Sequence, residues 1–123
     1  MILVDTSVWV DHLRTGDAAL AASLEAGLVL THPFVIGELA LGALAEREIL
    51  LGSLRDLPRA TVASDDEVLV LIEREGLQGR GIGYVDVHLL ASVRLTPDAS
   101  LWTRDKRLQT VAKALSLTVA ALR

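Results

Sequence analysis

Four acidic residues interrupt the apolar pattern of this sequence: Asp5, Glu38, Asp86 and Asp105. Two of them follow strand-like apolar runs, at residues 2–4 and 100–103. The other two share predicted helix faces with apolar residues three or four positions away. Most of the remaining acids lie at helix N-termini, at turns or on solvated helix faces. We therefore expect these four carboxylates at positions where the pattern predicts an apolar contact with the core.

A buried carboxylate is costly unless a cation pairs with it or it caps a helix, and Asp5 and Asp105 are also candidates for helix N-caps. No Lys or Arg shares the apolar faces of the four acids. Two carboxylates about 5 Å apart repel by about 3 kcal/mol at an effective dielectric constant of about 20. A cluster of four therefore favours a hard divalent cation, and all-oxygen ligands favour Mg²⁺ or Mn²⁺ over Zn²⁺. The matching chemistry is metal-assisted displacement at phosphorus, in which the ion makes hydroxide from water.

The elements that must position these acids follow from the hydrophobic periodicity. We expect strands at residues 2–4, 28–31, 61–63, 100–103 and 117–121, and helices at residues 6–14, 17–26, 34–44, 46–57, 64–75, 84–95 and 105–115. Short apolar strands that alternate with helices predict an α/β fold. Its centre would be a parallel sheet of about five short strands with helices on both faces, in a single domain over residues 1–123. The carboxyl ends of parallel strands share one edge of the sheet, where such folds place their sites.

The composition excludes several classes of protein. The chain has 123 residues, which suits one domain, and no cysteine, which excludes disulfides, cysteine–zinc sites and a thiol nucleophile. Its net charge of −4 argues against nucleic-acid binding through bulk positive charge but not against a local basic rim. The longest segment without a charged residue, residues 26–37, is too short to span a membrane. No signal-peptide pattern opens the chain, so we expect a cytoplasmic protein without membrane contact.

The segments around the four acids are similar to four motifs of one family. They are MILVDTSVWVDHLR at residues 1–14, VIGEL at 35–39, GYVDVHLLA at 83–91 and LWTRDKRL at 101–108. A single Asp-Thr-Ser segment is weak evidence, whereas four motifs in the right order across residues 1–108 are strong evidence. On these motifs the chain resembles the PIN-domain ribonucleases, specifically the VapC-like toxins of type II bacterial toxin–antitoxin systems.

The resemblance implies a metal-dependent endoribonuclease that leaves 5′-phosphate and 3′-hydroxyl ends on structured RNA such as tRNA or rRNA. It also implies Mg²⁺ or Mn²⁺ as the cofactor, and a VapB-like antitoxin whose C-terminal segment blocks the cleft. By position, Asp5, Asp86 and Asp105 would bind the metal ion most directly. Glu38 would complete the set of ligands or hold a ligating water.

Residues around the acids have expected supporting roles. By the same resemblance, Thr6 and Thr103 would hold the carboxylates through hydrogen bonds. Three arginines near the predicted site are expected to contact RNA phosphates, although ordinary surface charge explains each of them as well: Arg14, Arg80 and Arg104. Arg80 is favoured among them because its neighbours are glycines, and a mobile loop beside the third acid would bring it to the substrate.

The histidines and tryptophans favour structural roles. His88 lies two residues from the third acid and therefore on another helix face, which favours packing over a role as ligand or base. His12 and His32 are expected to pack or to cap helices. Trp9 and Trp102 are expected to lie in the core, with base stacking as the alternative.

Three other functions are weighed against a nuclease. A response-regulator receiver, which would be a phospho-switch, needs adjacent acids after its first strand, whereas Asp5 stands alone and Asp65 and Asp66 open a helix. A phosphatase of the haloacid dehalogenase type needs Asp-x-Asp at the same place, and residues 5–7 lack the second acid. A PIN-fold binding module without catalysis would be expected to have lost an acid, and none is missing.

The chain is more apolar than a small monomer needs to be, with 51% hydrophobic residues and a mean hydropathy of +0.44. The predicted helix at residues 34–44 has no polar side chain except Glu38, and a helix that is apolar all round is expected to be covered all round. The following helix adds more leucines and an isoleucine. We expect these helices to form a groove occupied by an antitoxin helix, a second protomer or both, in a homodimer or a toxin–antitoxin hetero-oligomer.

Overall fold

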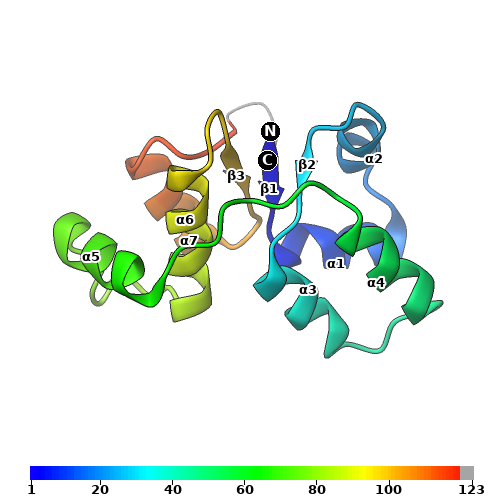
Figure 1. Ribbon diagram of the computed structural model, residues 1–123, viewed down its shortest axis with the longest axis horizontal. Helices are drawn as coiled ribbons and strands as arrows, with labels where there is room; N and C mark the ends of the chain where they lie inside the picture. Colours follow the sequence, from blue (N-terminus) through cyan, green and yellow to red (C-terminus); the bar gives the residue numbers. More distant parts are fainter. Residues whose placement is uncertain (120–123) are drawn as a thin grey trace.

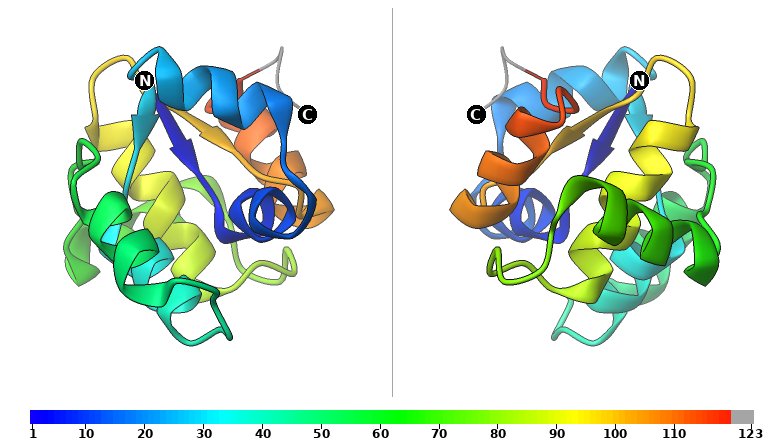
Figure 2. Two further views of the ribbon diagram at one scale, coloured as in Figure 1. Left: turned by 90° about the vertical axis from the view of Figure 1, so that its right-hand side faces the viewer. Right: turned by 90° about the vertical axis from the view of Figure 1, so that its left-hand side faces the viewer.

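The centre of the protein is a three-stranded parallel sheet in the order β2-β1-β3 (Figure 1). The structure, a computed structural model, describes residues 1–119. The strands are β1 (Ile2–Val4), β2 (Val29–Leu30) and β3 (Ser100–Trp102). Every residue of β1 is buried, as expected for a continuous apolar run in the middle of a covered sheet. Figure 2 shows the arrows of β1 and β3 pointing to the same end of the molecule.

Helices surround this sheet on two sides (Figure 1). The bounds are α1 (Thr6–Thr15), α2 (Ala18–Glu25), α3 (Pro33–Ala40), α4 (Arg47–Arg55), α5 (Asp65–Glu75), α6 (Tyr84–Leu95) and α7 (Lys106–Ala114). In the view of Figure 1, α1 to α4 lie on the side of β2, and α5 to α7 lie on the side of β3. The predicted α/β class with a parallel sheet is confirmed.

The sheet has fewer strands than the five expected. Residues 61–63 form no strand, because two of their backbone amides are bound by the side chains of Ser92 in α6 and of Thr96, which follows α6. The Thr61 amide donates to Thr96 Oγ1 at 2.9 Å, and the Ala63 amide lies 3.4 Å from Ser92 Oγ. The expected strand at residues 117–121 is reduced to one bridge, between Thr118 and Leu101, and its last two residues lie outside the described part of the chain.

The helix expected at residues 34–44 is shorter, since α3 ends at Ala40. Gly42, a poor helix former, follows in a bend, and Glu46 at the start of α4 has a left-handed backbone with φ of 50°. The chain therefore turns away after α3. Leu41 at this turn is 90% exposed and Ile49 of α4 is 68% exposed, so part of the apolar surplus lies on the surface.

Aliphatic side chains form most of the core, and both tryptophans lie in it as predicted, with 4% of Trp9 and 2% of Trp102 exposed. His32 is also buried, and it caps α3 by accepting a hydrogen bond from the Phe34 amide at Nδ1. Its burial, with electrostatic interactions with His88 and Arg59 as smaller causes, lowers its pKa from 6.5 to about 4, so the ring is neutral at pH 7.

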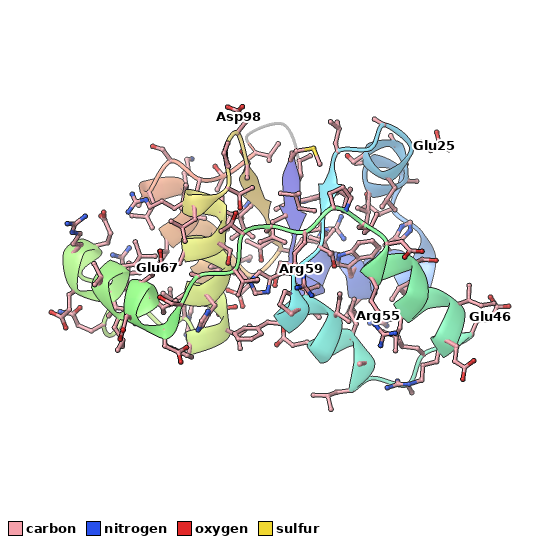
Figure 3. The ribbon with its side chains drawn as sticks, viewed as in Figure 1. Glu25, Glu46, Arg55, Arg59, Glu67 and Asp98 are labelled. Atoms are coloured by element: carbon pink, nitrogen blue, oxygen red, sulfur yellow. The ribbon has the colours of Figure 1, made fainter. Side chains whose placement is uncertain are left out.

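Charged side chains lie mainly outside this core. In Figure 3, Glu25, Glu46 and Asp98 extend from the outer edges of the molecule, and all three are exposed. Within residues 1–119, no helix has the length and apolar character needed to cross a membrane.

Candidate active site

The sheet brings the ends of two distant segments together. Val4 pairs with Trp102 in the register of β1 and β3, and the Asp5 amide donates to the Trp102 carbonyl at 2.9 Å. Asp5 and the residues after Trp102 therefore leave the sheet side by side at one edge, although they are about a hundred positions apart in sequence.

Asp5 is held by two hydroxyl groups. Its Oδ2 atom accepts hydrogen bonds from Ser7 Oγ at 2.7 Å and from Thr103 Oγ1 at 2.8 Å, and the residue is only 6% exposed. Asp5 occupies the N-cap position of α1, but its side chain makes no capping hydrogen bond. The side chain of Asp5 therefore does not cap α1, and the alternative role considered for it is wrong.

Asp105 does cap the helix that follows it. Its Oδ1 atom accepts a hydrogen bond from the Leu108 amide at 3.0 Å, at the first turn of α7. The Asp105 amide donates to Thr103 Oγ1 at 3.1 Å. Thr103 therefore connects the first acid to the fourth, and Oδ2 of Asp105 accepts no hydrogen bond from residues 1–119.

The other two acids come from helices. Thr6 Oγ1 donates to Glu38 Oε1 at 2.8 Å and so connects the start of α1 to α3. Asp86 lies in the first turn of α6, where its Oδ2 atom accepts a hydrogen bond from the Gly83 amide at 3.0 Å. Both acids are thereby attached to a neighbouring segment through one oxygen and keep the other.

The expectation that all four carboxylates replace core contacts is wrong for two of them. Asp5 is buried and Asp86 is half-buried, but Glu38 and Asp105 are exposed. The buried face of α3 is formed by Val35 and Leu39, so Glu38 lies beside this face and towards solvent. Solvent is thus largely excluded from Asp5, whereas it reaches Glu38 and Asp105, which form the rim of the site.

The four carboxylates interact electrostatically. Burial raises the pKa of Asp86 above its ordinary value of 3.8, and the negative charges of Asp5, Asp105 and Glu38 raise it further. The hydrogen bond from the Gly83 amide acts in the opposite direction. Asp86 therefore lies close enough to the other three acids to interact with their charges.

The donor atoms suit a hard divalent cation. Each of the four carboxylates keeps one oxygen that accepts no hydrogen bond from the described residues, and oxygen donors are those that Mg²⁺ and Mn²⁺ prefer. As the side chains stand in residues 1–119, no three His, Asp or Glu groups are arranged to hold a metal ion. Mutual repulsion keeps like charges apart, so a bound cation would have to draw the carboxylates together.

A groove opens beside Glu38, with a volume of about 420 Å³. It runs between α1, α3 and the segment that leads into α4, and most of its lining is apolar. The lining residues are Thr6, Val10, Leu13, Arg14, Glu38, Leu39, Gly42, Ala43, Leu44, Ala45 and Leu50. Arg14, expected near the site, therefore lies in the same groove as the second acid.

Arg80 lies on the other side of the site, in a basic depression of about 210 Å³ that it shares with Lys106 and Arg107. The Arg107 side chain covers Gly81 so closely that a Cβ atom there would lie 2.8 Å from Arg107 Cδ. Gly81 also has a φ of +77°, which favours glycine. Gly81 therefore allows α7 and this loop to approach each other.

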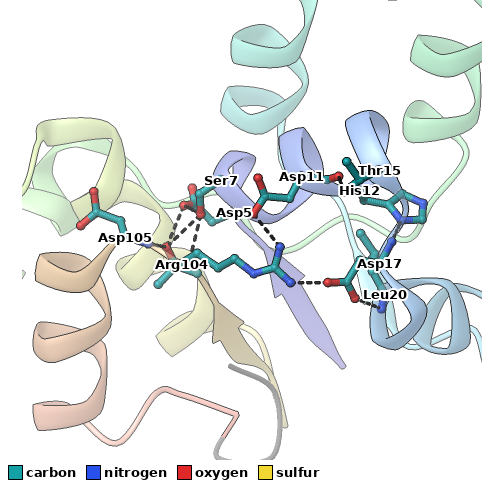
Figure 4. Close-up of polar contacts among 10 residues, drawn as sticks. Asp5, Ser7, Asp11, His12, Thr15, Asp17, Leu20, Arg104 and Asp105 are labelled. Carbon is teal, nitrogen blue, oxygen red and sulfur yellow. Dashed lines mark hydrogen bonds and ion pairs between the residues drawn. The ribbon is translucent and has the colours of Figure 1, made fainter.

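Arg104, also expected to bind RNA, has its guanidinium group bound to protein. Nη1 donates to Asp11 Oδ2 at 2.7 Å, and Nη2 donates to Asp17 Oδ2 (Figure 4). These two acids and Ser7 were not predicted as part of the site. The position of Ser7, two residues after a strand-end aspartate, could have indicated that its hydroxyl group binds that aspartate. Nothing in the local sequence around Asp11 or Asp17 indicates that they bind the distant Arg104.

The histidines have the structural roles expected for them. His88 is buried, with its ring 4.7 Å from the ring of Phe34 and 4.7 Å from that of Tyr84. Its Nε2 lies 3.3 Å from Asp65 Oδ1, but without the geometry of a hydrogen bond. His12 accepts a hydrogen bond from the Asp17 amide at the end of α1, as expected for a capping residue.

Two comparisons with known proteins, one with family models and one with curated proteins, point to the same family. The PIN domain family matches residues 2–114. Two curated proteins, both named Ribonuclease VapC32 and from two strains of Mycobacterium tuberculosis, are each 48% identical to this chain over 120 residues. Those residues cover 98% of this chain and 97% of each relative.

The raised pKa of Asp86 predicts how acidity affects stability in the absence of metal. Because the folded state holds this proton more tightly than the unfolded state, stability falls as pH rises from about 3.8 through the raised pKa. Asp86→Asn removes this dependence and should raise the melting temperature of the metal-free protein at neutral pH. Thermal melts from pH 4 to 8, with EDTA, check both effects. A variant that melts below the wild type at pH 7 contradicts the interpretation.

Proposed function

The chain belongs to the PIN-domain family and is a ribonuclease of the VapC type; from this premise we propose that it is a Mg²⁺- or Mn²⁺-dependent endoribonuclease toxin that cleaves structured RNA of the tRNA or rRNA class. The observation that supports this most directly is the set of four carboxylates from separate elements near the carboxyl ends of the strands, with the pKa of Asp86 raised by burial and further by the charges of the other three. We further propose that the protein acts in the cytoplasm, where such RNA is found.

In this proposal Asp5, Asp86 and Asp105 would hold the divalent cation, since each keeps a carboxylate oxygen that accepts no hydrogen bond from the described residues. When bound, the cation supplies the charge that lowers the pKa of water and stabilises the phosphorane-like transition state. Glu38, which like Asp105 is exposed at the site rim, would either complete the set of ligands or hold the attacking water by a hydrogen bond. Hydrolysis then adds water across the bond between phosphorus and O3′ and leaves 5′-phosphate and 3′-hydroxyl ends.

The hydroxyl groups of the site fix the carboxylates for this role. Ser7 and Thr103 each donate their only proton to Asp5, and Thr6 donates to Glu38. These bonds restrict the orientation of two carboxylates before substrate binds. Such partners of metal ligands commonly change metal affinity or activity by about 10- to 100-fold when they are removed.

Asp5→Asn and Asp86→Asn should both fold but lose Mg²⁺-dependent RNA cleavage by at least about 100-fold, because a ligand and its negative charge are removed. Circular dichroism checks folding, and gel analysis of a labelled structured RNA checks cleavage. Saturating Mn²⁺, at about 100 times its dissociation constant, should stabilise the wild type by about 2.7 kcal/mol and Asp5→Asn far less.

Two controls separate this proposal from the alternatives. Asp98→Asn, an exposed acid at the opposite end of β3, should leave cleavage unchanged. Full cleavage by Asp5→Asn or Asp86→Asn would overturn the assignment of the site. A wild-type chain that binds RNA but never cleaves it, with any divalent cation, would instead support a non-catalytic binding module. Membership of the PIN-domain family leaves no place for a receiver-like phospho-switch.

We assign contacts with RNA phosphates to Arg80 and to Arg14, which lie on opposite sides of the carboxylates. Arg80 shares its depression with Lys106 and Arg107, and none of these three forms an ion pair within residues 1–119. Basic side chains there would offset the repulsion between an acidic site and a polyanionic substrate. The net charge of −4 is thus compatible with RNA binding along this rim.

Replacing Arg80 and Arg107 together by glutamine should weaken RNA binding and reduce the slope of log K against log salt by about 0.7 for each lost phosphate contact. Binding is measured by fluorescence anisotropy in an Asp86→Asn background, which prevents cleavage. The matched control is Arg55→Gln at the end of α4, an exposed arginine outside both depressions. An unchanged salt slope in the double variant would remove these residues from the RNA-binding surface.

We also propose that the apolar groove beside Glu38 binds a segment of a VapB-like antitoxin. The groove is lined by apolar side chains from α1 and from residues 39–50, and it ends at a catalytic acid. A bound segment would cover this surface and block access to the site at once. A toxin–antitoxin hetero-oligomer of this kind accounts for part of the apolar surplus, and a homodimer would cover further exposed apolar residues such as Leu69 and Val70.

Leu13→Asp tests the groove, because Leu13 lines it and is 39% exposed, so the charge is added at little cost to folding. We expect antitoxin affinity to fall by about 10-fold or more, and inhibition of cleavage with it. The candidate to test is a short reading frame upstream of this gene that encodes a DNA-binding antitoxin, and isothermal titration calorimetry gives the affinity. Leu69→Asp on α5, which is 54% exposed, is the matched control. Equal antitoxin affinity in the two variants would place the antitoxin elsewhere.

A further inference from the structure

Arg104 connects the β3–α7 turn to two other elements, and we propose that it is a positioning residue that holds Asp5 and Asp105 in place rather than a ligand of RNA. The inference rests on the proposed function, since it concerns the same carboxylates. It changes the role expected for Arg104 from the sequence, where its proximity to the fourth acid suggested a phosphate contact.

The backbone around Arg104 is part of the network of the first acid. The Arg104 amide donates to Ser7 Oγ at 3.0 Å, and Ser7 Oγ in turn donates to Asp5. One residue earlier, Thr103 donates to Asp5, and one residue later the Asp105 amide donates to Thr103. Residues 103–105 therefore place both carboxylates relative to each other through two hydroxyl groups.

The side chain of Arg104 attaches this turn to the opposite side of β1. Its guanidinium group bridges Asp11, in the middle of α1, and Asp17, the N-cap of α2 (Figure 4). Its Cζ atom also lies 5.7 Å from the centre of the Trp102 ring. Three contacts in different directions restrict the guanidinium to one place.

The charges of this bridge support each other. Asp17 accepts a hydrogen bond from the Leu20 amide, which lowers its pKa, and the bond from Arg104 lowers it further. The two carboxylates in turn raise the pKa of Arg104. The side chain of Asp17 is 16% exposed, that of Arg104 28% and that of Asp11 49%. Asp17 is thus the better shielded partner and the more informative one to change.

The same contacts argue against a phosphate ligand. Both terminal nitrogens of Arg104 are bound to carboxylates, and a phosphate that approached them would also meet the negative charges of Asp11 and Asp17. Arg80 and Arg107 carry no such partners within the described residues. The basic residues Arg80, Lys106 and Arg107 are therefore a different feature from the bridge that Arg104 forms between Asp11 and Asp17, although Arg104 lies close to them in sequence.

The consequence concerns metal binding. If the Arg104 side chain is released, the turn at residues 103–105 keeps its backbone bond to Ser7 but loses its attachment to Asp11 and Asp17, so the hydroxyl groups that orient Asp5 are held less firmly. Partners of this kind change metal affinity or activity by about 10- to 100-fold. Arg104→Gln should therefore bind Mn²⁺ about tenfold more weakly and have a lower kcat, while its KM for RNA at saturating metal stays that of the wild type.

The experiment measures three quantities in each variant: free Mn²⁺ by electron paramagnetic resonance, kcat and KM for RNA cleavage, and the melting temperature. Asp17→Asn is the second variant, because asparagine still caps α2 but loses the charge that binds Arg104. It should show the same loss of Mn²⁺ affinity, and the double variant should add little more. Arg94→Gln, which breaks the ion pair with Glu75 between α5 and α6, is the matched control and should leave Mn²⁺ binding unchanged.

The outcomes separate the possible roles. Weaker Mn²⁺ binding in both single variants without a change in KM supports the proposal. A higher KM in Arg104→Gln with unchanged Mn²⁺ affinity, together with a lower KM in Asp17→Asn, identifies an RNA ligand and overturns it. A lower melting temperature with unchanged Mn²⁺ affinity identifies a purely structural bridge and also overturns it. If Arg104→Gln does not fold, Asp17→Asn alone decides. A failure of the proposed function would be seen in a different measurement, because the Asp86→Asn variant would then still cleave RNA.

Discussion

Repulsion among four carboxylates at one edge of a small sheet is the constraint on which the rest of this structure depends. Burial raises the pKa of Asp86 and the negative charges of Asp5, Asp105 and Glu38 raise it further, whereas the hydrogen bond from the Gly83 amide lowers it. In a chain of this size such a cluster costs stability that hydrogen bonds, caps and a cation must offset. Most of the polar contacts at this end of the molecule can be explained as responses to that cost.

Those contacts form an inner and an outer layer. In the inner layer, the hydroxyl groups of Ser7 and Thr103 donate to the one deeply buried acid, Asp5. In the outer layer, Arg104 binds two acids that lie outside the cluster and thereby fixes the turn that carries the fourth acid. The positive charge nearest to the cluster in sequence is thus used to organise it and is not placed within it. A cation can then enter without competing with an internal salt bridge.

The surfaces around the site have different characters, which suits an enzyme with two kinds of partner. On the side of α7, basic residues border the acids without ion pairs in the described chain, and RNA can be held there. On the side of α1 and α3, the lining is apolar and reaches Glu38, which suits a protein segment. A partner bound on the apolar side would therefore block the site from a direction other than that of the basic rim.

The sequence by itself determined the α/β class and the strands β1 and β3, after whose carboxyl ends Asp5 and Asp105 follow, because hydrophobic periodicity is a local signal. It predicted too many strands, because the backbone at residues 61–63 is bound by the side chains of Ser92 and Thr96, which lie about thirty residues away. It also could not show that Glu38 and Asp105 are exposed or that Arg104 is bound to Asp11 and Asp17. Those properties depend on how α1, α2 and the β3–α7 turn pack around β1, and only the tertiary structure brings residues ninety positions apart within hydrogen-bond distance.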